Sequence, residues 1–466
     1  MKSAAEHVRS RFASLVRRAF GEFLALPFGV LLVFVALAAL LYWLDDVSWS
    51  TSRPGAGSNL LERFFGDAQA MSSLLSTVAS SMITVTSITF SLLLVAVQQG
   101  ASALTSQVFD QFLRRRWNQF YFGFFVGLST FVLITLVTVS SFHRPILATL
   151  VALVMTAAAL CMMVVLIYNT VDQMRPGEIV RTIHRFVLAA RARELDLLAR
   201  TRRSPDTARR SVAAILSDGN GVVTAIAIDG LRDAAGDEAE LDLQVVIGST
   251  VAFRSTLCLV RARQPLTPER EAGFADRVRQ AIRLEHGRDL ACDAAYGIEQ
   301  LATIGWTSMS TAKSNPQPGI LVCRALTDIL SRWSDAGPVP EDPSSPVVYH
   351  DDVVGAAVRA LESLVVVASE SIQHQSLAEI VRSLAFLLGR LPAAAATEIE
   401  GVALRSLSTL GEHVPTRELD RAHRALAEAL VAAGFAETAG RVEAARVGLA
   451  QSSGHLNSRS TRVPDA

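Results

Sequence analysis

The chain has 466 residues, of which half are apolar and 19% are charged, and its formal net charge is zero. This length is enough for two or three domains, and the balanced charge gives no indication of nucleic-acid binding. The four cysteines have neither CxxC nor zinc-finger spacing, so they predict reduced structural thiols and no metal framework.

Four segments in the first third of the chain are long and apolar enough to cross a bilayer, which takes about 20 helical residues. They are residues 23–44, 71–97, 120–142 and 146–170. We therefore predict an α-helical integral membrane protein with a four-helix transmembrane domain over residues 23–170. The first segment lacks a clear small-residue cleavage site and ends in an aromatic and acidic edge, which indicates a retained span and not a signal peptide.

The positive charges of the short loops predict the orientation of these spans. Five cationic residues precede the first span: Lys2, Arg9, Arg11, Arg17 and Arg18. Three more lie between the second and third spans, whereas the loop 45–70 has two and the third turn has one. The basic N-terminus, residues 1–22, is therefore expected to be cytoplasmic, and so is everything after the fourth span. Within the loop 45–70, residues 60–65 predict a short amphipathic helix on the outer surface.

The second predicted span carries hydroxyl side chains at intervals of three or four residues. They are Ser73, Ser76, Thr77, Ser80, Thr84, Ser87 and Ser91. This spacing places them on one face of a helix. A helix face that contacts lipid gains nothing from hydroxyl side chains. Two interpretations therefore remain for the stripe. The stripe packs against another helix, or copies of the helix surround an axis and the hydroxyls line a pore with Gln98 at its inner mouth.

No Asp, Glu, Lys, Arg or His lies inside the four predicted spans, which argues against a proton-coupled transporter or pump. Four spans are too few to enclose a pathway, so a pore requires a homo-oligomer. We predict a homo-oligomeric protein whose second span lines a passive pore for an ion. The alternative is a non-conducting, membrane-anchored scaffold or sensor whose cytoplasmic part binds partners. The chain is not expected to be an enzyme, because it has no phosphate-binding glycine loop, zinc helix or nucleophile turn.

The sequence after residue 170 is predicted to form a cytoplasmic α+β region. Residues 171–216 are expected to form basic juxtamembrane helices, with an apolar face that lies on the inner leaflet or serves as the stem of a bundle. The basic side is assigned to Arg181, His184, Arg185, Arg191 and Arg193. Residues 217–264 are expected to form a small β-barrel-like unit with a hairpin turn at Asn220-Gly221. Its predicted strands are residues 222–228, 241–247, 250–253 and 256–260.

Residues 265–450 predict a helical bundle, and residues 451–466 a disordered polar tail. The expected helices are residues 268–285, 294–303, 318–336, 353–371, 376–391, 394–412 and 417–449. Between the second and third of these, Ser310, Lys313 and Asn315 belong to a polar segment that is a capped loop by default and a ligand or subunit contact as the alternative. His350, Asp351 and Asp352 are adjacent and point in different directions, so they predict a helix cap. We predict no catalytic site, no metal and no cofactor.

Three sequence elements resemble a bacterial membrane-protein family, the domain of unknown function numbered 2254. Residues 80–92, read as SSMITVTSITFSL and continued by VAVQQ at 95–99, resemble its hallmark helix. Residues 293–298 resemble its Asp-Pro-Ala-Phe-Gly-Leu element. Residues 310–316 resemble its Ser-Pro-x-x-Asn-Asp-Pro element, with Thr, Ser and Asn in place of Pro, Asn and Asp; Arg254 replaces a usual Gly.

The resemblance covers about residues 20 to 430. It implies a four-span protein of the bacterial inner (plasma) membrane with a cytoplasmic domain, and it implies no activity.

Overall fold

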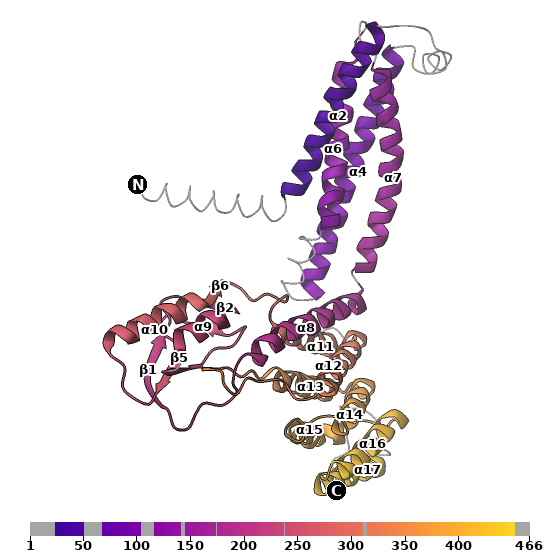
Figure 1. The fold of residues 1–466 in the computed structure, drawn as a ribbon. Coiled ribbons are helices and arrows are strands. Elements are labelled where there is room, and N and C mark those ends of the chain that lie inside the picture. Colours follow the sequence, from indigo (N-terminus) through magenta and orange to yellow (C-terminus); the bar gives the residue numbers. More distant parts are fainter. Residues whose placement is uncertain are drawn as a thin grey trace, which may run out of the picture. The chain divides into compact units, whose positions relative to one another are not determined.

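The computed structural model describes residues 24–50, 68–103, 116–140, 145–173, 175–236, 238–310 and 315–452. The chain divides into two compact units, Met1–Arg175 and Pro176–Ala466. Figure 1 shows their helices and strands. The predicted N-terminal segment 1–22, the predicted outer helix 60–65 and most of the predicted tail, residues 453–466, lie outside the described residues.

The first unit consists of long helices. They are α2 (Ala25–Ser50), α4 (Ala68–Ala103), α6 (Arg116–Thr138) and α7 (Ile146–Gln173). Each contains a stretch of 20 to 25 residues that is apolar and long enough to cross a membrane. The prediction of four membrane-spanning helices is confirmed at this level.

Helix α6 is the most deeply buried of the four and packs against the other three. Two glycines four residues apart allow α2 to come close to it. A Cβ on Gly123 would lie 2.7 Å from the Cα of Pro27, and a Cβ on Gly127 would lie 2.5 Å from Cδ2 of Phe34. This is the small-xxx-small packing typical of membrane helices. The Phe34 ring then stacks edge-on against Phe124, with 5.5 Å between centroids.

The start of α7 is held by a carboxylate from α2. The two oxygens of buried Asp45 accept hydrogen bonds from the backbone N–H groups of Leu147 and Ala148, at 3.1 and 3.2 Å. The first N–H groups of a helix have no partner within it, and the helix dipole favours negative charge at that end. Asp45 therefore serves as a helix cap supplied from a distant part of the chain.

The second unit begins with α8 (Pro176–Ala199), whose apolar face packs on α11 (Ala294–Met309) and α12 (Gln317–Asp335). The apolar face of α8 was predicted to lie either on the inner leaflet or in the stem of a bundle. In the structure it is covered by protein, as expected for a stem. The assignment of Arg191 to the exposed basic side is wrong. Arg191 is buried, because it follows Val187 by four residues and so lies on the same face.

Two small sheets follow α8. The first has the strand order β1 (Arg210–Leu216), β5 (Thr256–Ala262), β3 (Ala239–Leu243) and β7 (Val347–Val348). The second has the order β4 (Thr250–Val251), β2 (Gly221–Ile226) and β6 (Ile282–Glu285). The helices α9 (Ile228–Ala235) and α10 (Pro268–Ala281) lie between strands in the chain. All pairs are antiparallel except β3 with β7.

The predicted barrel-like unit is wrong, because neither sheet closes and both leave edge strands. The sheets take β1, β6 and β7 from outside the stretch that was expected to supply them. The predicted hairpin at Asn220-Gly221 is also wrong: β1 and β2 flank this turn, but they belong to different sheets.

The rest of the unit is a stack of helices. It continues from α11 and α12 with α13 (Val353–Glu370), α14 (His374–Leu388), α15 (Ala393–Ser406), a short 3-10 helix η2 (Leu407–Glu412), α16 (Arg417–Ala432) and α17 (Ala436–Ser452). Alternate helices lie side by side: α11 packs on α13 and α13 on α15, while α12 packs on α14 and α14 on α16. Stacked helix pairs of this kind occur in α-solenoids.

One predicted helix, residues 417–449, is two helices in the structure. Gly434 has a φ of 90°, a conformation that favours glycine. The N–H of Gly434 donates to the carbonyl of Val431 at 3.1 Å, and the N–H of Phe435 donates to that of Leu430 at 2.8 Å. These bonds close the end of α16 in the manner of a glycine C-cap.

Candidate functional site

The hydroxyl stripe of α4 lies on the side opposite the core of the first unit. The buried positions of α4 include Met71, Leu75 and Met82. Ser73, Thr77 and Thr84 follow them by two residues, which is about 200° around a helix. All seven hydroxyl residues of the stripe are exposed in the described part of the chain. The stripe therefore lies outside the packed core of the described part of its bundle.

Exposed apolar residues flank the stripe. Helix geometry places Ile83 and Phe90 on one side of it and Ile88 on the other, and each is about half exposed. The uncovered face thus has a polar centre and apolar margins. Such a face suits contact with another protein helix better than contact with hydrocarbon alone.

Two threonines of the stripe donate to the backbone of their own helix. Thr77 Oγ1 donates to the carbonyl of Ser73 at 2.9 Å, and Thr84 Oγ1 donates to that of Ser80 at 3.0 Å. Their protons are thereby satisfied, while the oxygens keep lone pairs for a further donor or a cation. A contact between two hydroxyls inside the unit uses other residues: Thr86 Oγ1 and Ser129 Oγ are 3.2 Å apart.

The remaining residues singled out in the sequence are only partly described. The side chain of Gln98 and the whole of Lys313 lie outside the described residues. Ser310 ends α11, where its hydroxyl donates to the carbonyl of Thr307 at 3.0 Å. The N–H of Asn315 donates to the carbonyl of Ser308 at 3.2 Å. The described ends of this segment are thus engaged in local capping bonds.

A buried ionic cluster on α8 was not foreseen from the sequence. Arg191 Nη1 lies 2.5 Å from Asp351 Oδ2 and 3.2 Å from Glu194 Oε2. The other oxygen of Glu194 accepts a hydrogen bond from the N–H of Ala294, at 3.2 Å. The guanidinium also lies 5.5 Å from the ring centroid of Trp333. A signal did exist, because Arg191 and Glu194 continue the helical spacing of the apolar face of α8.

The surroundings of this cluster shift its protonation. Burial raises the pKa of Glu194 to about 7, although the attraction of Arg191 opposes the shift. The neighbouring charge of Asp351 contributes to the shift in the same direction as burial. For Arg191, burial acts to lower the pKa, but the two carboxylates outweigh it and the pKa is raised, so the guanidinium stays charged.

The element at residues 293–298 begins α11 beside this cluster. Asp293 caps the helix by accepting a hydrogen bond from the N–H of Tyr296 at 2.8 Å. Its carboxylate also receives two bonds from Arg288, at 2.7 and 3.1 Å. At Gly297 a Cβ would lie 2.4 Å from Cγ2 of Val187 on α8. The element thus sets how closely α11 packs on α8.

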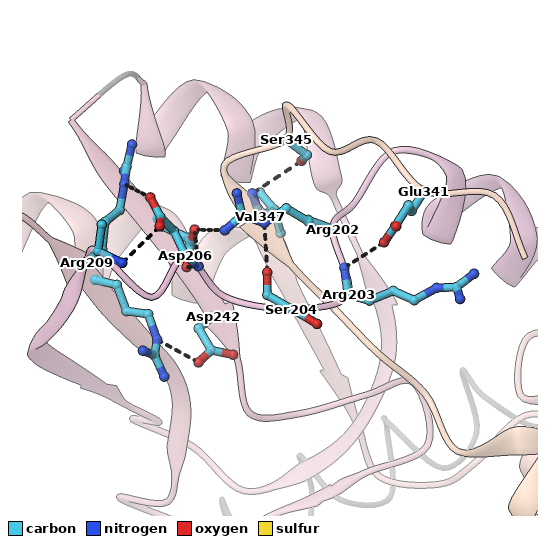
Figure 2. Close-up of polar contacts among 12 residues, drawn as sticks. Arg202, Arg203, Ser204, Asp206, Arg209, Asp242, Glu341, Ser345 and Val347 are labelled. Carbon is cyan, nitrogen blue, oxygen red and sulfur yellow. Dashed lines mark hydrogen bonds and ion pairs between the residues drawn. The ribbon is translucent and has the colours of Figure 1, made fainter. Parts of the chain in front are cut away.

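A second set of polar contacts joins the segment after α8 to β3 and to the segment before β7, and Figure 2 shows part of it. Arg202 pairs with buried Glu240, whose two oxygens also accept from the N–H of Asp206 at 3.1 and 3.2 Å. The N–H of Arg203 donates to Glu341 at 3.4 Å. Each of these carboxylates accepts hydrogen bonds from a neighbouring segment of the chain. We therefore interpret the contacts as holding these segments together. Within the described ranges, no group of three His, Cys, Asp or Glu side chains is arranged to hold a metal ion.

Four apolar helices of membrane-spanning length and a mostly helical second unit define the class: a membrane protein with several apolar helices. The chain belongs to the family described as "Predicted membrane protein (DUF2254)", which matches residues 21–379. The resemblance seen in the sequence is thereby confirmed. No curated protein and no solved structure matches the chain.

Proposed function

We propose that this protein is a homo-oligomer of the bacterial inner membrane, in which copies of α4 surround an axis and form a passive pore for ions. One observation supports the proposal most directly. The hydroxyl stripe that includes Thr84 and Ser87 faces away from the protein's own bundle and is uncovered in the described part of the chain. Oxygen atoms along such a face can replace part of an ion's hydration shell without fixed charges.

The charge content of the spans agrees with a passive pathway. The four candidate spans contain no Lys, Arg, His or Glu, and their one Asp is Asp45. Asp45 caps the start of α7, so it has a structural partner. Transporters driven by protons keep an ionisable group inside the membrane. The proposal therefore includes neither coupled transport nor a catalytic reaction.

Conduction is tested by incorporating the purified full-length protein into planar bilayers. Wild type should show ionic currents, and Thr84→Leu and Ser87→Leu should reduce the unitary conductance. Ile83→Leu, on the apolar margin of the stripe, is the matched control and should conduct as wild type. Silent traces for all four proteins would defeat the pore.

Assembly is tested by cross-linking in membranes, in a background where the exposed Cys161 is replaced by Ser. Thr84→Cys should form disulfide-linked dimers, because copies of α4 meet around the axis. Val164→Cys, on the outward side of α7, should not. If Val164→Cys cross-linked and Thr84→Cys did not, α7 and not α4 would lie at the subunit interface, and the proposed arrangement would be wrong.

The second candidate is a non-conducting scaffold or sensor. The internal hydrogen bonds of Thr77 and Thr84 favour it, since hydroxyls satisfied within their helix can lie in a dry interface between subunits. The stacked helices of the second unit would then offer the surface that binds partners. Cross-linking through Thr84 together with silent bilayers would support this candidate over the pore.

A further inference from the structure

The ionic cluster on α8 has one more carboxylate than it has cations. Arg191, Glu194 and Asp351 have side chains that are only 5%, 4% and 10% exposed. Arg191 makes its closer contact, 2.5 Å, with Asp351, and it reaches Glu194 at 3.2 Å. With all three groups ionised, a net negative charge is buried, which is unfavourable in a medium of low dielectric constant.

Among the described residues, the elements packed around Glu194 place no second cation in contact with it. From α11, the N–H of Ala294 donates to Oε1, and the neighbouring Asp293 is already paired with Arg288. From the segment before α13, Tyr349 and Asp351 face the cluster. Within the described part of the chain, Arg191 is the one cation in contact with Glu194.

The side of α12 contributes an aromatic ring and a separate ion pair. The ring of Trp333 faces Arg191. His184 Nε2 lies 2.7 Å from Asp328, but His184 precedes Arg191 by about two turns of α8. Arg332 also pairs with Asp328 at 2.7 Å. These groups contact Asp328 and make no contact with Glu194 among the described residues.

We propose that Glu194 is a proton-binding site that sets how firmly α8 is held against α11 and the segment before α13. With a proton bound, Glu194 is a neutral carboxylic acid beside a balanced Arg191–Asp351 pair. When the proton leaves to solvent, two buried carboxylates compete for one guanidinium and the contact of α8 with its neighbours weakens. The inference concerns the second unit alone and does not depend on the proposed pore.

The direction of the pH effect follows from linkage. Burial raises the pKa of Glu194 to about 7 in the folded protein, from 4.5 when the chain is unfolded. The folded state therefore binds this proton more tightly than the unfolded state. The stabilisation is complete below about pH 4.5 and is lost as the pH rises through about 7. A change near neutral pH is thus converted into a change in the packing of the helix that follows the last span in the chain.

Hydrogen exchange of the full-length protein in detergent tests this inference. The opening equilibrium constant of the amides at residues 190–198, corrected for intrinsic exchange, should rise about tenfold between about pH 6 and about pH 8. Glu194→Gln mimics the protonated acid and should remove this dependence. Glu178→Gln, at a more exposed site on the same helix, should behave as wild type.

A second variant keeps the test decisive if Glu194→Gln does not fold. Asp351→Asn removes the carboxylate that competes for Arg191. Arg191 can then pair fully with Glu194, and this lowers the pKa of Glu194. The midpoint of the opening transition should then move to lower pH than in wild type. A pH-independent opening constant in wild type, a dependence retained in Glu194→Gln, or an unmoved midpoint in Asp351→Asn would each overturn the inference.

Discussion

Two single residues, Gly297 and His413, show how local contacts affect the stability of the second unit. At Gly297, α11 lies so close to α8 that a Cβ would meet Val187 at 2.4 Å. We expect Gly297→Ala to lower the free energy of unfolding by about 1–3 kcal/mol, the range for overpacking a tight contact. Thermal unfolding of the detergent-solubilised protein, followed by circular dichroism, measures the change.

The control for this substitution is Gly273→Ala in α10, where nothing lies within 4 Å of an added Cβ. Alanine is the better helix former, so this variant should gain about 0.5–1 kcal/mol. Equal effects at the two glycines would show that α8 and α11 are not in close contact.

His413 predicts a pH dependence in the acidic range. Its ring is buried, with Nδ1 3.0 Å from Nδ1 of His374. Burial, together with the nearby His374 and His423, lowers the pKa of His413 to about 4. Because the unfolded chain takes up a proton near pH 6.5 and the folded protein does not, stability falls as the pH drops from about 6.5 to about 4. The loss approaches about 3 kcal/mol.

This dependence is measured by denaturant unfolding at a series of pH values. His413→Gln should flatten the acidic limb, whereas the exposed His286→Gln should keep it. An acidic limb that is unchanged in His413→Gln would assign the effect to other groups. The Glu194 effect has the opposite sign, so the two variants separate the contributions.

At the scale of elements, the capping of α7 by Asp45 links two helices that are distant in the chain. Asp45 and Leu147 are 102 residues apart in the sequence. Asp45→Ala removes both acceptors and should cost about 1–2 kcal/mol of stability, as loss of a helix cap does. Asp45→Asn keeps one acceptor and should lose less. Protection of the first amides of α7 against hydrogen exchange provides the measurement, and equal protection in all three proteins would contradict the cap.

The helices themselves follow from local sequence. Apolar stretches of membrane-spanning length occur where four helices form. The end of α16 also has a local signal, Gly434, but the predicted helix 417–449 ran through it. The strands follow less well. β6 and β7 have four and two residues, and their pairing partners lie far away in the chain. Such short segments carry too little periodicity to predict a sheet.

For the whole molecule, the distribution of cationic loop residues predicts that both termini are cytoplasmic. A green fluorescent protein fused after residue 466 should fluoresce, and an alkaline phosphatase inserted after residue 57 should be active. The expected result follows because the first folds in the cytoplasm and the second folds outside it. The reverse pattern would invert the orientation and would place the second unit outside.

The sequence by itself determined the four apolar helices, the single-face spacing of the hydroxyls in α4 and the membership of the family, because these depend on neighbouring residues or on linear motifs. Only the tertiary structure decided that this face lies opposite the core of its own bundle, since burial depends on which helices pack together. It also decided that Arg191 is buried beside Asp351, a residue 160 positions away. Helical periodicity shows which residues share a face, but the excess negative charge around Glu194 exists only once the fold brings distant segments together.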